Sequence, residues 1–293
     1  MLAKKQWACI LDSLVELKTL LLVACLLCGW SFESWRPLQH GDERALKVRL
    51  RHAVNNFMMA VVSTLVSRGL ALVTLLYALQ WSQQQGVGLL AGLDLPVAFN
   101  WLAALLLIDI WQYGWHVMNH RWPFLWRFHV VHHADTTMDV TTGLRFHFVE
   151  TALSTLIRVP VFILLGVQVE HLLMYELVVL PVVLFHHSNI RLPSSLDRVL
   201  RWVIVTPGMH WVHHSNIHAE TNSNYSSLLS VWDRLFGSYR TRDNIAEVQL
   251  GVIGTEYTSF WRMLWLPFWG QPKQADADLS LIHISEPTRL GMI

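Results

Sequence analysis

Residues 109–147 read DIWQYGWHVMNHRWPFLWRFHVVHHADTTMDVTTGLRFH and begin at the end of a strongly apolar run. This stretch holds six histidines, arranged mainly as HxxxH and HxxHH. Further along, residues 209–215 (MHWVHHS) repeat the spacing of residues 128–134 (FHVVHHA). Imidazole is the commonest metal ligand in proteins. The repeated spacing therefore predicts that these histidines build a metal centre, and the apolar run places it at a membrane surface.

The composition indicates a membrane protein. Of the 293 residues, 53% are hydrophobic and 15% are charged, whereas soluble domains carry roughly 25% charged residues. The 15 tryptophans agree, because indole rings favour the membrane–water boundary. A net charge of +1 gives no indication of nucleic-acid binding. The three cysteines all precede the histidine region and form neither a zinc-type pair nor a disulfide framework.

Apolar runs separate the histidine groups. We expect membrane helices over residues 57–80 and 97–115, forming one hairpin, and over 148–167 and 171–185, forming a second. Residues 17–32 are also apolar, but they are short for a span of about 20 residues. The expected fold is thus all-α, an integral membrane protein with about four transmembrane helices in two hairpins.

The orientation follows from the charges. The loop at residues 34–51 is basic and residues 81–96 contain neither Lys nor Arg, so the positive-inside rule places the first on the cytoplasmic side. Both hairpins then return their histidines to that side. We therefore expect a cytoplasmic, histidine-rich helical cap that holds a dinuclear metal site.

The histidine spacings suit helices. On a helix, residues three and four apart share one face, so each motif offers two or three imidazoles together. The motifs supply at least eight nitrogens, whereas a tetrahedral zinc uses four ligands, and this surplus predicts two metals. Imidazole suits iron, zinc, copper and nickel alike. His186 and His187 are adjacent and cannot both face one metal; we favour His187, which heads the polar HSN stretch.

Some polar residues are candidates for orienting these imidazoles. Asp109 lies seven residues before His116, on the same helical face and in apolar surroundings. A carboxylate there is costly unless paired, and a hydrogen bond to a ligand imidazole would satisfy it. Asp135 and Asp139 closely follow the first HxxHH, although simple solvation in a loop is an equal alternative. We interpret other histidines as polar anchors at the interface: His40, His52, His171 and His218.

The order HxxxH, HxxHH, HxxHH, with apolar hairpins between the motifs, resembles the fatty acid hydroxylase / sterol desaturase superfamily of membrane di-iron enzymes. The resemblance covers residues 45–245 and looks closest to the bacterial sterol-desaturase-like branch. It is carried by LWRFHVVHHAD (125–135), DVTTGLRFH (139–147), FHHSNIRLP (185–193), TPGMHWVHHS (206–215) and NYSSLLSVWDRLFGSY (224–239).

The resemblance implies an enzyme with two Fe ions that uses O2 to hydroxylate or desaturate a C–H bond of a lipid, such as a sterol or fatty acyl chain. His147 stands where many members have a histidine followed by Pro, but Phe148 follows here, so His147 is left as a candidate for orienting a ligand. The implied metal ligands are His116, His120, His129, His132, His133, His187, His210, His213 and His214.

The sequence has no GxGxxG, CxxCH or iron–sulfur cysteine pattern. We therefore expect electrons from a separate ferredoxin- or cytochrome-b5-like donor with its reductase, and a location in the bacterial inner membrane. Hydroxylation and desaturation remain open alternatives. A non-catalytic or transport-type metal-binding protein is a third, although its spans should carry more acidic or histidine residues. A haem-based electron carrier is disfavoured because the histidines gather at span ends, and a metalloprotease because no HExxH occurs.

Four regions follow from this interpretation. Residues 1–44 form an N-terminal interfacial and apolar helical region, 45–245 the membrane catalytic domain, and 246–278 a C-terminal cap. Residues 279–293 begin LSLIHISEPTR, which resembles the translation of a sequencing-library adapter. We expect this last region to be a non-native tail and assign it no part in the fold.

Overall fold

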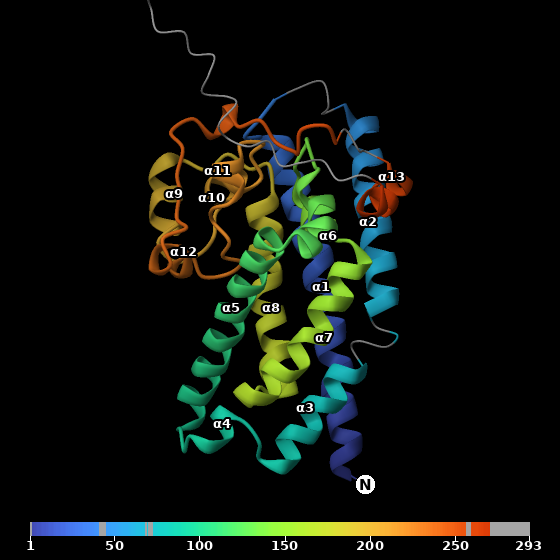
Figure 1. The fold of residues 1–293 in the computed structure, drawn as a ribbon, viewed down its shortest axis with the longest axis vertical. Coiled ribbons are helices and arrows are strands. Elements are labelled where there is room, and N and C mark those ends of the chain that lie inside the picture. The colour runs from blue at the N-terminus through green and yellow to red at the C-terminus, as the bar shows by residue number, and fades with distance from the viewer. Residues whose placement is uncertain (1, 41–44, 68, 70–72, 256–258, 270–293) are drawn as a thin grey trace, which may run out of the picture.

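The computed structural model describes residues 2–40, 45–67, 69, 73–255 and 259–269, and over these ranges the protein is helical without any β-strand (Figure 1). Residues 279–293 lie outside the described residues. The α-helices are α1 (Leu2–Trp35), α2 (Leu46–Val66), α3 (Val73–Gln85), α4 (Leu89–Gly92), α5 (Val97–Arg121), α6 (Pro123–His133), α7 (Phe148–Leu165), α8 (Val169–His187), α9 (Ser194–Leu200), α10 (Pro207–His213), α11 (His218–Thr221), α12 (Val231–Leu235) and α13 (Phe260–Trp265). Three short 3-10 helices complete the set: η3 (Val140–Leu144), η4 (Ile245–Glu247) and η5 (Leu266–Phe268).

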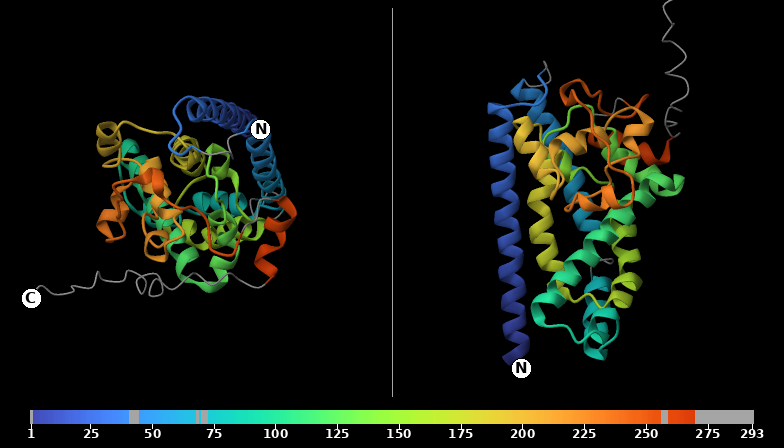
Figure 2. Two further views of the ribbon diagram at one scale, coloured as in Figure 1. Left: turned by 90° about the horizontal axis from the view of Figure 1, so that it is seen from above. Right: turned by 90° about the vertical axis from the view of Figure 1, so that its left-hand side faces the viewer.

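Four of the described helices are long and apolar enough to cross a membrane: Glu16–Trp35 within α1, all of α5, all of α7 and all of α8. They run along the long axis of the molecule, while α9 to α12 gather beside their upper ends (Figures 1 and 2). The number of spans matches the expectation, and three of the four expected spans are present.

The expected span at residues 57–80 is wrong. This stretch belongs to two helices, since α2 ends at Val66 and α3 begins at Val73. One side of α2 is polar and buried, with His52, Asn56 and Ser63 facing the protein. Counting apolar residues along the sequence does not reveal this buried polar side. The helix α1 supplies the fourth span instead.

The helix α1 continues past both ends of the apolar run 17–32. Polar residues of α1 have partners elsewhere in the protein, and the length of the apolar run does not reveal these partners. Lys18 Nζ lies 2.5 Å from Glu176 Oε2 on α8, and the buried Glu33 carboxylate accepts hydrogen bonds from the backbone of Val140 and Asn189 at 2.6 and 2.8 Å. These contacts join α1 to α8 and to η3.

The end of the bundle opposite the histidines is held by a close backbone contact. Gly166, which follows the last residue of α7, has φ 72°, and Gly88, which precedes α4, has φ 112°. A Cβ added to Gly88 would lie 2.4 Å from the Cα of Gly166. Only glycine allows both the left-handed backbone and this approach.

Two apolar clusters fix the helices around the site. One joins α6 to α2 and α13 and includes Val131, Met59 and Met263; the other joins α3, α5, α7 and α8 and includes Leu79, Ile108 and Phe162. Pro123 is the first residue of α6 and Trp122, before it, is extended, so the chain turns between α5 and α6. The turn brings the histidines of α6 back toward those at the end of α5.

Candidate metal centre

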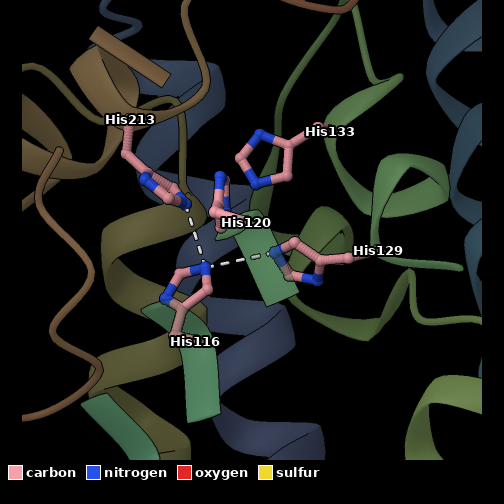
Figure 3. Close-up of side chains that lie close together, drawn as sticks. All are labelled: His116, His120, His129, His133 and His213. Carbon is pink, nitrogen blue, oxygen red and sulfur yellow. Dashed lines mark hydrogen bonds between the residues drawn. The ribbon is translucent and has the colours of Figure 1, made fainter. Parts of the chain in front are cut away.

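Five imidazoles from three helices form a first group, which we call site A. His116 and His120 lie one turn apart at the end of α5, and His213 comes from α10. In Figure 3 the rings point toward a common centre, with His116 Nε2 at 3.2 Å from that of His129 and at 3.0 Å from that of His213. One ligand nitrogen from each ring lies within 4.8 Å of all the others; the set is His116, His120, His129, His133 and His213.

Four imidazoles form a second group, site B, again with ligand nitrogens within 4.8 Å of one another: His132, His187, His210 and His214. The Nε2 of His187 lies 3.0 Å from that of His132 and 2.9 Å from that of His210. The Nε2 of His214 lies 3.1 Å from that of His210. The first site draws on α5, α6 and α10, and the second on α6, α8 and the end of α10.

The two HxxHH motifs serve the two sites in opposite ways. In the first motif the outer pair, His129 and His133, belongs to site A and the middle His132 to site B. In the second motif the outer pair, His210 and His214, belongs to site B and the middle His213 to site A. Residues four apart share a helical face, whereas neighbours point about 100° apart. Each motif therefore bridges both sites.

Backbone carbonyls and one carboxylate fix the orientation of five of these rings. The Nδ1–H of His116 donates to the carbonyl of Tyr225 at 2.7 Å, and that of His129 donates to Glu150 Oε1 at 2.8 Å. Three more donate to carbonyls: His132 to Arg145 at 3.2 Å, His187 to Val183 at 2.7 Å and His213 to Ser223 at 2.6 Å. Holding Nδ1 in this way leaves Nε2 free to face a metal ion.

The donor set suits a metal ion. Both ring nitrogens of His120 and of His133 are buried and have no hydrogen-bond partner among the described residues. Burying such atoms unpaired is costly, and a cation bound by one nitrogen of each ring reduces that cost. Neighbouring Nε2 atoms also face each other, an arrangement that a shared cation satisfies better than hydrogen bonds can.

The protonation states agree with metal binding. Burial, followed by the closeness of other imidazoles, holds the pKa of His132, His133, His210 and His214 well below the ordinary value. Burial lowers the pKa of His213 to about 3. These imidazoles are neutral at pH 7, and neutral imidazole is the form that binds a metal.

Asp109 does not orient an imidazole. Its carboxylate accepts hydrogen bonds from the Tyr175 hydroxyl and from Trp232 Nε1, each at 2.7 Å, and from the backbone N–H of Leu229 at 3.1 Å. It therefore ties α5 to α8 and to the segment around α12. We expected this buried carboxylate to have a hydrogen-bond partner, and it has three. None of the three is an imidazole.

Asp135 reaches a site histidine only through another residue. Its carboxylate contacts Arg145 Nη1 at 3.4 Å and accepts from Thr142 Oγ1 at 2.7 Å. The backbone carbonyl of Arg145 in turn accepts from His132. Asp139 caps η3 by accepting from the backbone N–H of Thr141 at 2.8 Å.

His147 and His186 lie outside both sites. His147 caps α7, because its Nδ1 accepts from the backbone N–H of Val149 at 3.2 Å while Nε2 donates to the Leu264 carbonyl at 3.1 Å. It thus orients no ligand directly. The ring of His186 packs on that of His210 with centroids 4.0 Å apart, whereas its neighbour His187 belongs to site B.

A cavity of about 1160 Å³ leads to both sites. It is lined by residues of α1, α2, α3, α5, α7 and α8, most of its wall is apolar, and it touches His116 and His129 of site A and His132, His187 and His210 of site B. It is large enough for a lipid-sized molecule, since ligand pockets commonly measure about 300–1,000 Å³.

Residues 101–238 match the family model described as fatty acid hydroxylase, and they contain all nine histidines of sites A and B. This region of the chain belongs to the fatty acid hydroxylase family. The resemblance expected from the sequence is thereby confirmed.

Several curated proteins similar to this chain are named as lipid hydroxylases or monooxygenases. It is 30% identical to ornithine lipid hydroxylase OlsE of Rhizobium tropici, over 59% of this chain and 51% of the relative. It is 27% identical to human alkylglycerol monooxygenase (67% and 42%) and 27% identical to human cholesterol 25-hydroxylase (48% and 51%). The match thus spans about half the length of these relatives or less. No solved structure matches the chain.

The roles of two residues near the candidate metal centre were not expected from the sequence. Glu150 accepts a hydrogen bond from His129. The sequence feature that could have indicated this is a carboxylate in the first turn of an apolar helix, because burying a carboxylate there is costly unless it has a partner. His52, expected to be an interfacial anchor, is buried between Asp135 and Asp139, with contacts of 2.9 and 3.1 Å. Its signal, a lone histidine far along the chain from both carboxylates, is too weak to use.

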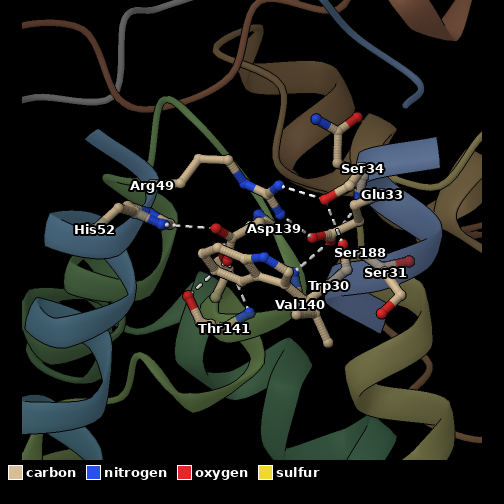
Figure 4. A network of polar contacts seen from close by, with 12 residues as sticks. Trp30, Ser31, Glu33, Ser34, Arg49, His52, Asp139, Val140, Thr141 and Ser188 are labelled. Atoms are coloured by element: carbon tan, nitrogen blue, oxygen red, sulfur yellow. Dashed lines mark hydrogen bonds and ion pairs between the residues drawn. The ribbon is translucent and has the colours of Figure 1, made fainter. Parts of the chain in front are cut away.

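Figure 4 shows His52 within a wider polar network that includes Arg49 and Glu33. Burial alone would lower the pKa of His52, but Asp135 and Asp139 outweigh it and raise the pKa to about 10. Arg49 Nη2 lies 3.0 Å from Glu33 Oε2 and its guanidinium stacks on Trp30. The network joins α1 and α2 to the loop that carries Arg145 and hence supports His132.

Proposed function

We propose that this protein is a membrane oxygenase that uses O2, two iron ions and external electrons to hydroxylate a C–H bond of a lipid. The observation that carries the proposal is the meeting of nine imidazoles in two groups, eight of them buried and His116 half-buried, beside a large, mostly apolar cavity. Membership of a family with lipid hydroxylases supports it.

The nine histidines of sites A and B would hold the metal. An all-imidazole donor set suits iron as well as zinc or copper, and the family membership favours iron. Bound iron would supply the O2 activation that side-chain acid–base chemistry cannot provide for an unactivated C–H bond.

The chain's own residues contribute three things. Burial of the imidazoles keeps them neutral and excludes water from the site. The carbonyls of Tyr225, Val183 and Ser223 hold the rings in position. The cavity wall orients the lipid beside both sites, and positioning of this kind accounts for a large part of enzymatic rate enhancement.

The remaining parts of the proposal concern the setting. We expect a ferredoxin- or cytochrome-b5-like electron donor, and insertion in the bacterial inner membrane with the histidine end facing the cytoplasm, as the basic residues at 34–51 predict. The donor would approach the face that carries α9 to α12.

The test compares lipid extracts of cells that express the protein with extracts of cells that express His132→Ala. We expect a lipid that gains one oxygen atom only with the unaltered protein, measured by mass spectrometry. Loss of two hydrogen atoms instead would identify a desaturase. Identical lipid profiles, with the protein present in the membrane at equal amounts, would contradict an enzymatic function and favour a metal-binding or transport protein.

A further inference from the structure

One candidate membrane helix, α7, contributes polar side chains to the wall of the cavity. Glu150, Ser154 and Arg158 follow one another at intervals of four residues along α7, so they share a face, and all three line the cavity. Thr151 and Thr155 line it beside them. A cavity for an apolar tail alone has no use for this face, because each polar group there must be satisfied away from water.

Arg158 is the most costly residue of this face. It stands in the middle of α7, whose mean hydropathy is 1.8. Its Nη2 donates to Gln112 Oε1 at 2.9 Å, which is a neutral acceptor. Its Nε is buried and has no hydrogen-bond partner among the described residues. A charged side chain at such depth marks a functional site by default.

The cavity holds three carboxylates, but only Glu176 lies close enough to interact with Arg158. Glu176 interacts electrostatically with Arg158, but its carboxylate also forms an ion pair with Lys18 Nζ at 2.5 Å. Two cations therefore share one carboxylate. Glu150 lies eight residues before Arg158 on α7, about 12 Å nearer the histidine end, where it accepts a hydrogen bond from His129. Glu170 is the second residue of α8, six residues before Glu176 and hence about 9 Å further from the histidine end. The region around Arg158 therefore has surplus positive charge.

We propose that Arg158 binds the anionic group, a carboxylate or a phosphate, of an amphiphilic substrate. The inference rests on the proposed function, since it takes the cavity as the site of the lipid. Arginine presents several N–H donors to oxyanions, and hydrogen bonds between two charged groups are the strong ones. The apolar walls from α1, α3 and α8 then take the hydrocarbon part.

The position of Arg158 limits which bond is oxidised. Its partner Gln112 lies four residues before His116 on α5, or about 6 Å along the axis, and Arg158 lies eight residues after Glu150 on α7, or about 12 Å. The anionic group is thus held about one to two helical turns from site A. The bond presented to the metal site lies near this group, not at the far end of a long tail.

The test measures binding in metal-free protein, so that it does not depend on oxidation. Protein in phosphatidylcholine nanodiscs at neutral pH is equilibrated with radiolabelled octanoate, octyl phosphate or octan-1-ol. We expect at least one of the two anions to bind about tenfold or more tightly than the alcohol. The tighter of the two identifies the anionic group. Equal affinity for the alcohol and both anions would overturn the proposal.

Two variants and a control sharpen this test. Arg158→Gln keeps a polar side chain but removes the charge, and should abolish the preference for the anion while octanol binding persists. Gln112→Glu keeps Arg158 but supplies a competing carboxylate, and should abolish the preference too. Arg198→Gln, an exposed arginine on α9, should retain it. An undiminished preference in Arg158→Gln contradicts the proposal. A preference for the anion without any oxidised lipid in expressing cells contradicts the proposed function instead.

Discussion

The Nε2 atoms of His132 and His187 lie 3.0 Å apart, although 55 residues separate them in the chain. One stands near the end of α6 and the other at the end of α8, and between them runs the whole of α7. His187 completes site B only because α8 returns to the end of the molecule from which α7 departs. The path of the chain through its long helices, more than local spacing, brings the histidines of site B together.

Replacing Glu150 with Gln should weaken metal binding at site A. The change removes the negative charge that faces the Nδ1–H of His129, and loss of such a partner typically costs about 10–100-fold in metal affinity. Competition with a chelator measures the affinity. Glu170→Gln is the matched control, because Glu170 also stands in the first turn of an apolar helix but belongs to neither site. Equal loss in both variants would argue against a specific role for Glu150.

Replacing Asp109 with Asn should lower stability and leave metal affinity unchanged. The carboxylate accepts three hydrogen bonds from α8 and the region of α12, and an amide facing these donors should cost about 1–3 kcal/mol. Thermal unfolding and chelator competition on one preparation measure both quantities. A drop in metal affinity without a drop in stability would restore the role that the sequence predicted for Asp109.

The stabilisation by His52 should depend on pH in a defined direction. The pKa of His52 is raised to about 10 in the folded protein by Asp135 and Asp139, whereas an unfolded histidine titrates near 6.5. Its contribution is therefore complete below about pH 6.5 and is lost as the pH rises through about 10. His52→Gln should lower the free energy of unfolding by about 3–5 kcal/mol near pH 6 and by much less near pH 10. His218→Gln, on α11, serves as the control, and a gap between wild type and His52→Gln that widens with pH would contradict the assignment.

Replacing Gly88 with Ala should destabilise the end of the bundle opposite the histidines. The new Cβ would overlap the backbone of Gly166, and φ 112° disfavours any L side chain. We expect a loss of about 1–3 kcal/mol, seen as a lower unfolding midpoint. Gly92→Ala is the control, since a Cβ there meets nothing within 4 Å. A midpoint unchanged in Gly88→Ala would show that the two segments do not touch.

The sequence predicted the parts of this protein that depend on local spacing. The nine histidines chosen from HxxxH, HxxHH and the HSN stretch are the nine that the structure gathers into two groups, and their role as ligands stays a prediction. The division of these histidines into sites A and B could not be predicted from the sequence, because it depends on how α6 and α10 face each other. His132 and His133 are neighbours in sequence yet belong to different sites.

The errors have a common physical cause. The span expected at residues 57–80, the unexpected span of α1 and the partners of Asp109 all involve polar side chains whose partners are distant in sequence. Lys18 is tolerated in α1 because Glu176 of α8 meets it. The length of an apolar run shows where a polar side chain would be costly to bury. It does not show the distant residue whose contact offsets that cost.

The central claim, a centre of two metal ions held by sites A and B, is tested most directly by metal analysis of protein purified from iron-supplemented cells. We expect about two irons per chain in the unaltered protein, about two in His218→Ala, and about one in His214→Ala, which removes a ligand of site B alone. One iron or none per chain in the unaltered protein would contradict the account.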